Sequence, residues 1–445
     1  MAAESCHSRS LSWLARSCIP ADPARHIAVP VPIPASTAAD AAADAEEECP
    51  ICGLPDELLL ECLARVPRAS LPALPAVCRR FASLLASHAF LHLRRAHGRL
   101  RPSLLAVAVP AHGHGHGAAS ARALLLRLHA SSSSAAARPE VEVSALPLPL
   151  SLLHCVGGGS SALALAHARA VALGRDVYLV GRGATLRVDA LTGVARACAP
   201  TLFPRKKFAA AAVGGRIYVA GGSARTAAVE EYDPAADAWR VVAEAPRRRY
   251  GCAGAGAGGV FYVAGGVAVS APGARALEAH VCAGSVDALH VASGGAWART
   301  RAVPAGGCVV GACGAGDHLY VVASHAVELS FWRWCGGVNR GGGGGGGDGS
   351  SINRGACGWV ALAAPPVPRG AVGLGMAVRV AMAAVGGDRV VAVVNVSAVR
   401  GHNAAAGAVA LEGAVLVYDI AGGTWSRAPD LPPGFRRAAC AAVEC

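Results

Sequence analysis

Residues 215–222 read GRIYVAGG, which combines a tight turn, a short apolar strand and a double glycine. Glycine tolerates the left-handed backbone that such turns require, and the β-branched and aromatic residues favour a strand. Similar segments recur along the chain: GRDVYLVG at 174–181, GVFYVAGG at 259–266, GDHLYVV at 316–322 and, more weakly, GDRVVAVV at 387–394. Such recurrence indicates a repeat architecture.

A second signature follows the strand in several repeats. It joins an acidic turn to a Trp-bearing segment: VEEYDP at 229–234 with Trp239, SVDA at 285–288 with Trp297, and VLVYD at 415–419 with Trp425. This order of features, at a spacing of about 40 to 70 residues, resembles kelch repeats. The resemblance implies that each repeat forms a four-stranded blade of a β-propeller.

The repeats predict a mainly β fold, a six-bladed kelch propeller over residues 103–445. Five full units are expected at 163–203, 205–246, 249–304, 307–368 and 370–432. The C-terminal segment 436–445 resembles the opening strand at 206–213, and further strands are expected at 104–109, 123–129 and 141–146. We expect these pieces to pair as a sixth blade, 103–147 plus 436–445, because a closed ring has no exposed sheet edges.

A helical pattern precedes the repeats. Residues 53–67 read GLPDELLLECLARVP, and residues 74–85 read LPAVCRRFASLL. Pro55 suits the first turn of a helix, and Asp56 and Glu57 complement the helix dipole. Apolar residues recur at helical spacing in both segments, so each helix has an apolar stripe. Short helices of this kind leave apolar surface that needs a partner.

The order of Leu-Pro, Val-Pro and Val-Cys-Arg-Arg-aromatic residues resembles an F-box, expected at residues 49–98 as a small all-α domain. The resemblance implies docking onto a Skp1-like protein and, through it, onto a cullin. The residues expected to contact Skp1 are Leu54, Pro55, Leu58, Leu59, Val66, Pro67, Val77, Cys78 and Phe81. Phe81 stands where many F-boxes have Trp. The alternative is an ordinary helical cap on the next domain, which has no need for this order of motifs.

Composition bounds the remaining possibilities. With 445 residues, 53% of them hydrophobic, the chain can build a sizeable core. Residues 1–48 are rich in Ser, Ala and Pro and are expected to form a disordered leader. Charges interrupt every long apolar run, so we expect no membrane span. The 16 Cys lack regular spacing and are expected to be reduced thiols. With the F-box, this favours the cytoplasm or nucleus.

Three motifs resemble ligand sites but lack the context that such sites need. The CxxC at 49–52 has no second Cys or His pair at zinc-finger distance. The HGHGH at 112–116 lies in a low-complexity segment, and the glycine run at 341–347 lacks the Lys-Ser or Lys-Thr of a phosphate-binding loop. We therefore expect no metal and no cofactor.

Together these features resemble those of the plant-type F-box/kelch-repeat proteins. The resemblance implies a non-catalytic substrate-recognition subunit of a Skp1-cullin-F-box (SCF) ubiquitin ligase, whose propeller binds the protein to be ubiquitinated and degraded. Two alternatives stay open: a kelch enzyme of the oxidase or specifier type, and a kelch scaffold that acts outside the ligase. An oxidase needs a copper site of Tyr, His and Cys, which the sequence pattern does not supply.

The chain is basic, with a formal net charge of +12, yet Lys206 and Lys207 are its only lysines. Scarcity of lysine would protect a ligase subunit from ubiquitination of its own side chains. The alternative cause is a G/C-rich gene, whose codons favour Ala, Gly and Arg over Lys.

In kelch propellers, the residues that enter each blade's first strand border the central channel. Here they are His167, Arg169, Arg205, Lys206, Lys207, Arg247, Arg248, Arg249, Arg369, Arg436 and Arg437. Arg suits carboxylate or phosphate, so we expect an acidic or phosphorylated protein substrate rather than nucleic acid.

Overall fold

Two compact units make up the chain, residues 1–54 and residues 55–445. The computed structural model describes residues 51, 53–109, 121–128, 141–146, 164–165, 167–268, 283–292, 294–300, 302–325, 327–335, 358–368, 371–372, 376–398 and 411–445. Several sequence features lie outside the described residues: the leader expected at 1–48, Cys49 and Cys52, the segments 112–116 and 341–347, and Arg369.

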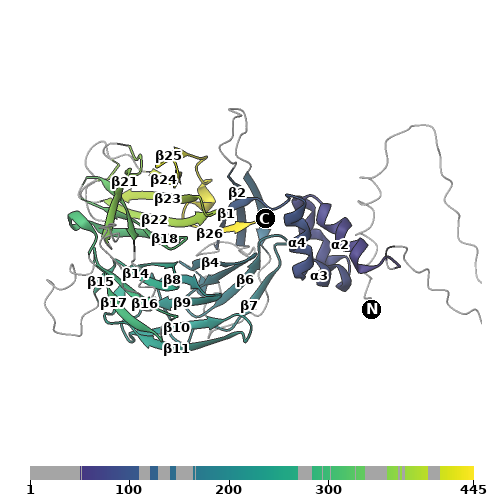
Figure 1. Ribbon diagram of the computed structural model, residues 1–445, viewed down its shortest axis with the longest axis horizontal. Helices are drawn as coiled ribbons and strands as arrows, with labels where there is room; N and C mark the ends of the chain where they lie inside the picture. Colours follow the sequence, from purple (N-terminus) through teal and green to yellow (C-terminus); the bar gives the residue numbers. More distant parts are fainter. Residues whose placement is uncertain are drawn as a thin grey trace, which may run out of the picture. The chain divides into compact units, whose positions relative to one another are not determined.

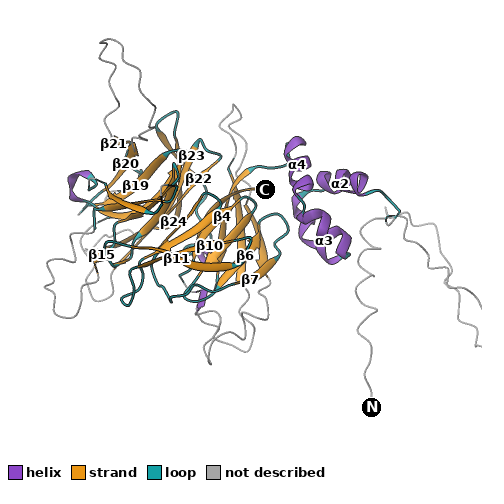
Figure 2. Ribbon diagram, turned by 60° about the horizontal axis from the view of Figure 1, so that its bottom comes forward, coloured by secondary structure: helices purple, strands orange, loops and turns teal. Residues whose placement is uncertain are grey.

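Helices open the second unit: α2 (Asp56–Arg65), the 3-10 helix η1 (Arg68–Ala76), α3 (Arg79–Ala86) and α4 (His88–Ala96). Two of the α-helices have side-chain caps. The Sγ of Cys78 accepts a hydrogen bond from the Phe81 N–H at the start of α3, and the Oγ of Ser87 accepts one from the Phe90 N–H at the start of α4. Figure 2 shows these helices together, in purple, with strands forming most of the chain that follows.

Six four-stranded antiparallel sheets follow, which confirms the expected six-bladed propeller (Figure 1). Blade 1 contains β4 (Arg169–Leu173), β5 (Asp176–Val180), β6 (Thr185–Asp189) and β7 (Ala195–Cys198); blade 2 contains β8 (Ala209–Val213), β9 (Arg216–Ala220), β10 (Ala228–Asp233) and β11 (Ala238–Glu244); blade 3 contains β13 (Ala253–Ala257), β14 (Val260–Ala264), β16 (Val286–His290) and β17 (Ala296–Arg299). Blade 4 contains β18 (Cys308–Ala315), β19 (His318–Ser324), β20 (Leu329–Cys335) and β21 (Gly358–Leu362); blade 5 contains β22 (Met376–Val385), β23 (Arg389–Ala398), β24 (Leu411–Asp419) and β25 (Thr424–Arg427). Shorter elements are β12 (Arg249–Tyr250), β15 (Val267–Ala268), η3 (Pro304–Gly306) and η4 (Pro433–Phe435).

Blade 6 combines both ends of the propeller sequence. It contains β26 (Ala439–Glu444), β1 (Pro102–Ala108), β2 (Ala121–Arg127) and β3 (Val141–Leu146), in that order. β26 pairs with β1 in antiparallel register, with Leu104 opposite Ala442, and Figure 1 shows the yellow β26 beside β1. Sequence similarity between the C-terminal segment and an opening strand predicts this pairing. It closes the ring through backbone hydrogen bonds.

The first strands of the blades line the centre of the ring. β4, β8, β13, β18, β22 and β26 contact one another in turn, and β26 contacts β4. Small residues permit this close approach, since a Cβ at Gly254 would overlap the backbone of Ala210, and a Cβ at Gly314 would overlap that of Gly256. The double glycine acts similarly, because a Cβ at Gly222 would lie 2.7 Å from the carbonyl oxygen of Lys206. Glycine at these three positions is thus a packing requirement.

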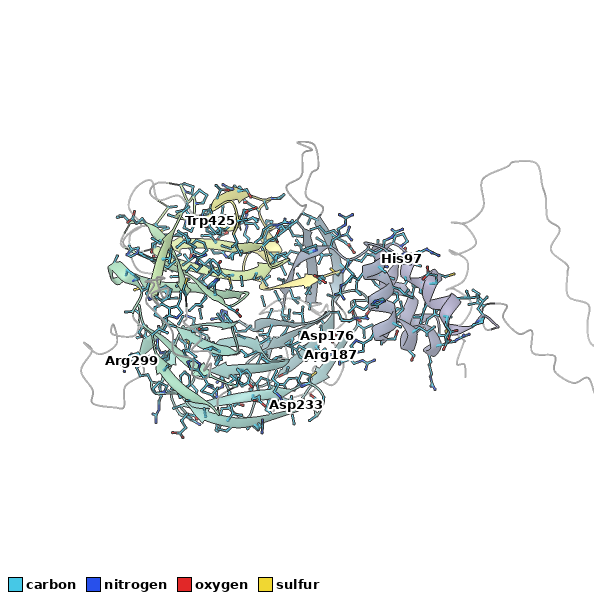
Figure 3. The ribbon with its side chains drawn as sticks, viewed as in Figure 1. His97, Asp176, Arg187, Asp233, Arg299 and Trp425 are labelled. Carbon is cyan, nitrogen blue, oxygen red and sulfur yellow. The ribbon has the colours of Figure 1, made fainter. Side chains whose placement is uncertain are left out.

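Two of the three tryptophans of the second repeat signature, Trp239 and Trp425, join neighbouring blades. Trp239 of β11 donates its indole N–H to the carbonyl of Ala199, which follows β7, at 2.9 Å. Trp425 of β25, labelled in Figure 3, donates to the carbonyl of Ala363, which follows β21, at 2.7 Å. Each indole therefore satisfies a carbonyl of the preceding blade, while its ring packs on a Tyr of its own blade.

Candidate functional site

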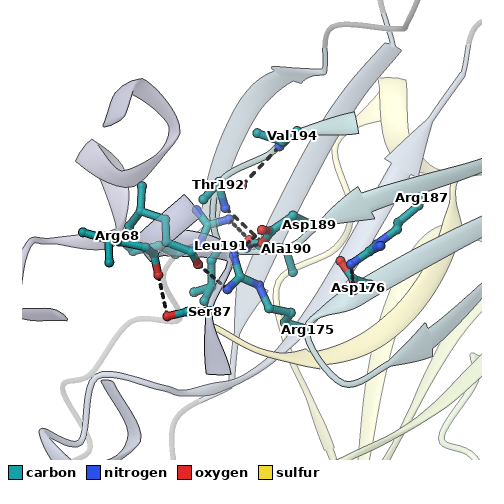
Figure 4. A network of polar contacts seen from close by, with 12 residues as sticks. Arg68, Ser87, Arg175, Asp176, Arg187, Asp189, Ala190, Leu191, Thr192 and Val194 are labelled. Carbon is teal, nitrogen blue, oxygen red and sulfur yellow. Dashed lines mark hydrogen bonds and ion pairs between the residues drawn. The ribbon is translucent and has the colours of Figure 1, made fainter. Parts of the chain in front are cut away.

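Polar contacts join the F-box-like helices to blade 1 (Figure 4). Arg175, in the turn between β4 and β5, donates to the carbonyl of Leu85 in α3 at 2.6 Å and forms an ion pair with Asp189. Arg68 of η1 donates to the carbonyl of Ala190 at 2.7 Å. These bonds involve the turns after β4 and β6, so the helices pack at the end of blade 1 where its innermost strand finishes.

An apolar core continues from the helices into the propeller. Leu59, Leu63 and Phe90 are buried in one cluster with Leu105 of blade 6 and Val177 of blade 1. Residues 55–445 therefore form a single compact unit.

Arg94 of α4 forms hydrogen bonds with the C-terminal end of α2 inside this core. Its guanidinium donates to the carbonyls of Ala64 and Val66 at 3.2 and 2.8 Å. Burial lowers the pKa of Arg94 to about 10, because the charged form loses water. The side chain still has carbonyl partners, so it stabilises the turn after α2.

One face of the helices leaves apolar side chains exposed. Leu58 of α2 is 55% exposed and Val77, just before α3, is 63% exposed. Cys62 and Cys78 are exposed as well. An ion pair of 2.6 Å between Asp56 and Arg80 holds the first turns of α2 and α3 together. We call Leu58, Cys62, Val77 and Cys78 the F-box apolar patch; such exposure of apolar residues is typical of a docking surface.

The residues expected to contact Skp1 occupy different environments. Leu58, Val77 and Cys78 lie in the patch. Pro55 and Pro67 are exposed, and so is Leu54 of the first unit, while Val66 and Phe81 are partly buried against the core. The structure corrects the expectation that Leu59 contacts Skp1. Leu59 is 4% exposed and belongs to the core, because α4 and the propeller cover that side of α2.

Basic residues gather where the innermost strands begin. His167 and Lys207 each lie two residues before an inner strand, β4 and β8, and Arg437 lies two residues before β26. Arg379 lies within β22, six residues before its end, the same offset that His167 has from the end of β4 and Lys207 from the end of β8. With Lys206 these residues form what we call the basic mouth: His167, Lys206, Lys207, Arg379 and Arg437.

The five side chains influence one another. The pKa of His167 is lowered, first by burial and then by the positive charges of Arg379, Lys206, Lys207 and Arg437. The pKa of Arg379 is also lowered, by burial and by Arg437. All five side chains reach solvent, although neighbouring atoms displace part of the water around His167 and Arg379, and among the described residues no Asp or Glu forms an ion pair with any of the five. The mouth is thus a concentrated positive charge without a carboxylate partner.

Two of the arginines predicted to bind substrate are structural instead. Arg205 is 1% exposed and donates to Glu230 at 2.7 Å and to the carbonyls of Gly221 and Ala228. Arg249, also 1% exposed, bonds Asp287 at 2.5 Å. Their assignment to an exposed surface is therefore wrong, because buried carboxylates hold them inside blades 2 and 3.

The other residues predicted to bind substrate differ in the contacts that their side chains already make. Arg169 donates to the carbonyls of Phe208 and Cys252 at 2.8 and 3.1 Å and so links blade 1 to blades 2 and 3. Arg247 pairs with Asp287, and Arg436 pairs with Glu412. Arg248 is exposed. The sequence analysis did not include Arg379. Its distance from the hairpin turn after β22 equals that of His167 and Lys207 from the turns after β4 and β8, and this spacing could have identified it.

The described part of the chain was also compared with the requirements of membrane spans, metal sites and cavities. No helix there is long and apolar enough to cross a membrane, and no group of three or more His, Cys, Asp or Glu side chains is placed to hold a metal ion. A hollow of about 440 Å³ lies between η1, α3 and blade 1, lined by Pro72, Leu85 and Thr192 among others.

Known proteins share both parts of the chain. The F-box domain model matches residues 51–93, and the kelch motif model matches residues 204–246. An F-box/kelch-repeat protein of Arabidopsis thaliana is 43% identical over 453 residues, which cover 99% of this chain and 99% of that protein. The F-box/kelch-repeat protein OR23 of Arabidopsis thaliana is 36% identical over 114 residues, 19% of this chain and 26% of that protein. Among solved structures, YjhT matches with a TM-score of 0.43 and 15% identity over 60% of this chain and 84% of that one.

Proposed function

We propose that this chain, which belongs to the plant-type F-box/kelch-repeat proteins, is the substrate-recognition subunit of an SCF ubiquitin ligase. In this role the F-box apolar patch binds a Skp1-like protein, which connects it to a cullin. The kelch propeller binds the protein to be ubiquitinated. The chain itself performs no catalysis, and its place of action is the cytoplasm or the nucleus.

The observation that carries the proposal is the separation of the two candidate surfaces. The helices bond to Arg175, which follows the last residue of β4, while His167 of the basic mouth precedes the first residue of β4. At about 3.3 Å per residue, the five residues of β4 span roughly 16 Å. Two partners can therefore bind at opposite ends of the inner strands without competing.

The chemistry of the basic mouth favours an acidic or phosphorylated substrate. Four cationic side chains influence His167, and each can donate charge-assisted hydrogen bonds to carboxylate or phosphate oxygens. Arg379 and Arg437 add the forked geometry that suits these groups. We propose that an acidic or phosphorylated segment of the substrate binds here.

Removal of the patch side chains tests the ligase role. Burying a Leu or Val side chain contributes about 1.5–3 kcal/mol, so Leu58→Ala with Val77→Ala should weaken Skp1 binding by about a hundred-fold or more. The measurement is co-purification and calorimetric titration of the full chain with a Skp1-like protein. Thermal unfolding should be almost unchanged, since both side chains are exposed.

Leu59→Ala is the matched control. Because Leu59 is buried, its truncation should destabilise the fold by about 2–5 kcal/mol and lower the melting temperature. Wild-type Skp1 affinity in the Leu58→Ala, Val77→Ala variant would contradict the ligase role. It would leave the scaffold and enzyme alternatives as the better explanations.

A further inference from the structure

The hollow between the F-box-like helices and blade 1 shares no residue with the basic mouth or the F-box apolar patch. We call it the junction hollow; its volume is about 440 Å³. Pro72, Pro75 and Leu85 line it from η1 and α3, whereas Asp176 and Arg196 line it from blade 1. Small-molecule sites have volumes of about 300–1,000 Å³ and are common where two compact parts of a protein meet. Size and position therefore suit a small-molecule ligand.

Backbone restraints and hydrogen bonds fix the walls of the junction hollow. Pro72 and Pro75 restrict the backbone of η1, because their rings fix φ. The side chain of Arg175 donates to the carbonyl of Leu85 at 2.6 Å, and Arg68 reaches blade 1 in the same way, with its donor 2.7 Å from a carbonyl. Figure 4 shows Arg68 and Arg175 where the helices meet blade 1. The hollow is thus formed before a ligand arrives, and binding needs to order few groups.

The charges that line the junction hollow do not balance. Asp176 forms an ion pair of 2.7 Å with Arg187, and Asp189 forms one with Arg175 (Figure 4). Arg196 of β7 also lines the hollow and is exposed, and its guanidinium has no hydrogen-bond or ion-pair partner among the described residues. The blade side of the hollow therefore carries one uncompensated positive charge, and the helix side is apolar.

We infer that the junction hollow binds a small amphipathic carboxylic acid. Its apolar body packs on the helix side, against Pro72, Pro75 and Leu85, and its carboxylate accepts hydrogen bonds from the guanidinium of Arg196. A neutral molecule of the same shape leaves Arg196 without a partner, and an amine places a second cation beside it. The bound acid contacts both the helices and blade 1, so it stabilises their junction. Binding involves no Skp1-like protein, so this inference does not depend on the ligase role.

Calorimetric titration of the full chain with 2-naphthoate tests the ligand class. This probe has two fused apolar rings and one carboxylate. The inference expects saturable binding of one molecule with a dissociation constant below about 1 mM, and a melting temperature that rises with the 2-naphthoate concentration. The neutral probe 2-naphthamide has the same shape and should bind about ten-fold more weakly. Absence of saturable binding, or equal affinity for the amide, would overturn the inference.

A pair of arginine variants locates the carboxylate. Arg196→Gln should lower the affinity for 2-naphthoate about ten-fold, because the charge-assisted hydrogen bond is lost. Arg182→Gln is the matched control: Arg182 is also an exposed arginine of blade 1, but it follows β5 at the end where β4 begins and does not line the hollow. Both variants should keep the wild-type melting temperature, since both side chains are exposed. Equal affinities in the two variants would exclude Arg196 as the carboxylate site and with it the inference.

A pair of alanine variants locates the apolar body. Ala86→Leu enlarges a side chain of α3 that lines the hollow and should weaken 2-naphthoate binding by about ten-fold or more. Ala89→Leu makes the same change at an exposed position of α4 outside the lining and should leave the affinity unchanged. Melting temperatures without ligand show that both variants fold. Poly-glutamate, the probe for the basic mouth, should not displace 2-naphthoate. Displacement by poly-glutamate, or full affinity in Ala86→Leu, would place the probe outside the hollow and refute the inference.

Discussion

The basic mouth and the buried arginines Arg205 and Arg249 carry the same charge in different surroundings. Lys206 is exposed and has no carboxylate partner among the described ion pairs, whereas Arg205, the preceding residue, is 1% exposed and bonded to Glu230. A buried cation is neutralised by its partner and holds a blade together. An exposed cation without a partner is available to a ligand. Net charge therefore does not locate a binding site; the position of the carboxylates does.

The largest effect should follow from breaking a buried pair. Arg205→Met leaves Glu230, which is fully buried, without its cation, and two carbonyls without a donor. We expect a loss of about 3–5 kcal/mol in the free energy of unfolding, measured by urea denaturation. Lys206→Met, one residue away and exposed, should change it by no more than about 0.5 kcal/mol. Similar losses of unfolding free energy in both variants would show that the buried and the exposed cation contribute equally to stability.

Charge reversal at the mouth should separate binding from stability. Each charge-assisted contact contributes about 1.5–3 kcal/mol, so Arg379→Glu with Arg437→Glu should weaken poly-glutamate binding by on the order of a hundred-fold. Binding is measured by fluorescence anisotropy at two salt concentrations, and wild type should be the more salt-sensitive protein. Unfolding and Skp1 binding should stay as in wild type. Unaltered affinity for poly-glutamate would move the anion site elsewhere.

The pH dependence of anion binding should depend on His167. Burial and four neighbouring cations lower the pKa of His167 in the free protein, and a bound anion raises it again. The added attraction is present below the free-state pKa and is lost as pH rises through the bound-state pKa. We expect at most about 1 kcal/mol of stronger poly-glutamate binding at the acidic end. His167→Gln should flatten this profile, and a persistent slope would assign it to another group.

The smallest effect concerns backbone strain at the mouth. Lys207 and His167 have positive φ, whereas Gly251 occupies the corresponding turn of blade 3. Lys207→Gly should relieve roughly 1 kcal/mol of strain, partly offset by the greater freedom of glycine in the unfolded chain. The expected result is a slightly higher melting temperature. Lys206→Gly is the control, because Lys206 does not have a positive φ, and it should be neutral or destabilising.

Much of the fold followed from local sequence patterns. Turn glycines and alternating strands predict five blades, and the acidic-turn and Trp signature marks three of them, because these features depend on neighbouring residues and on backbone geometry. The closing pair of β26 and β1 was predictable as well, since the C-terminal segment resembles an opening strand and a ring without free edges needs a partner for it. The sequence also showed that basic residues recur just before the first strands of several blades, because the position of each first strand follows from the repeat.

Tertiary structure alone decided which side chains remain available. Leu58 and Leu59 are adjacent in one apolar stripe, yet only Leu59 faces α4 and the propeller, and only Leu58 is left for a partner. Arg205 and Arg249 are neutralised by Glu230 and Asp287, which lie 25 and 38 residues further along the chain. Local sequence cannot reveal such pairings, because burial and charge neutralisation arise from strands brought together by the closed ring.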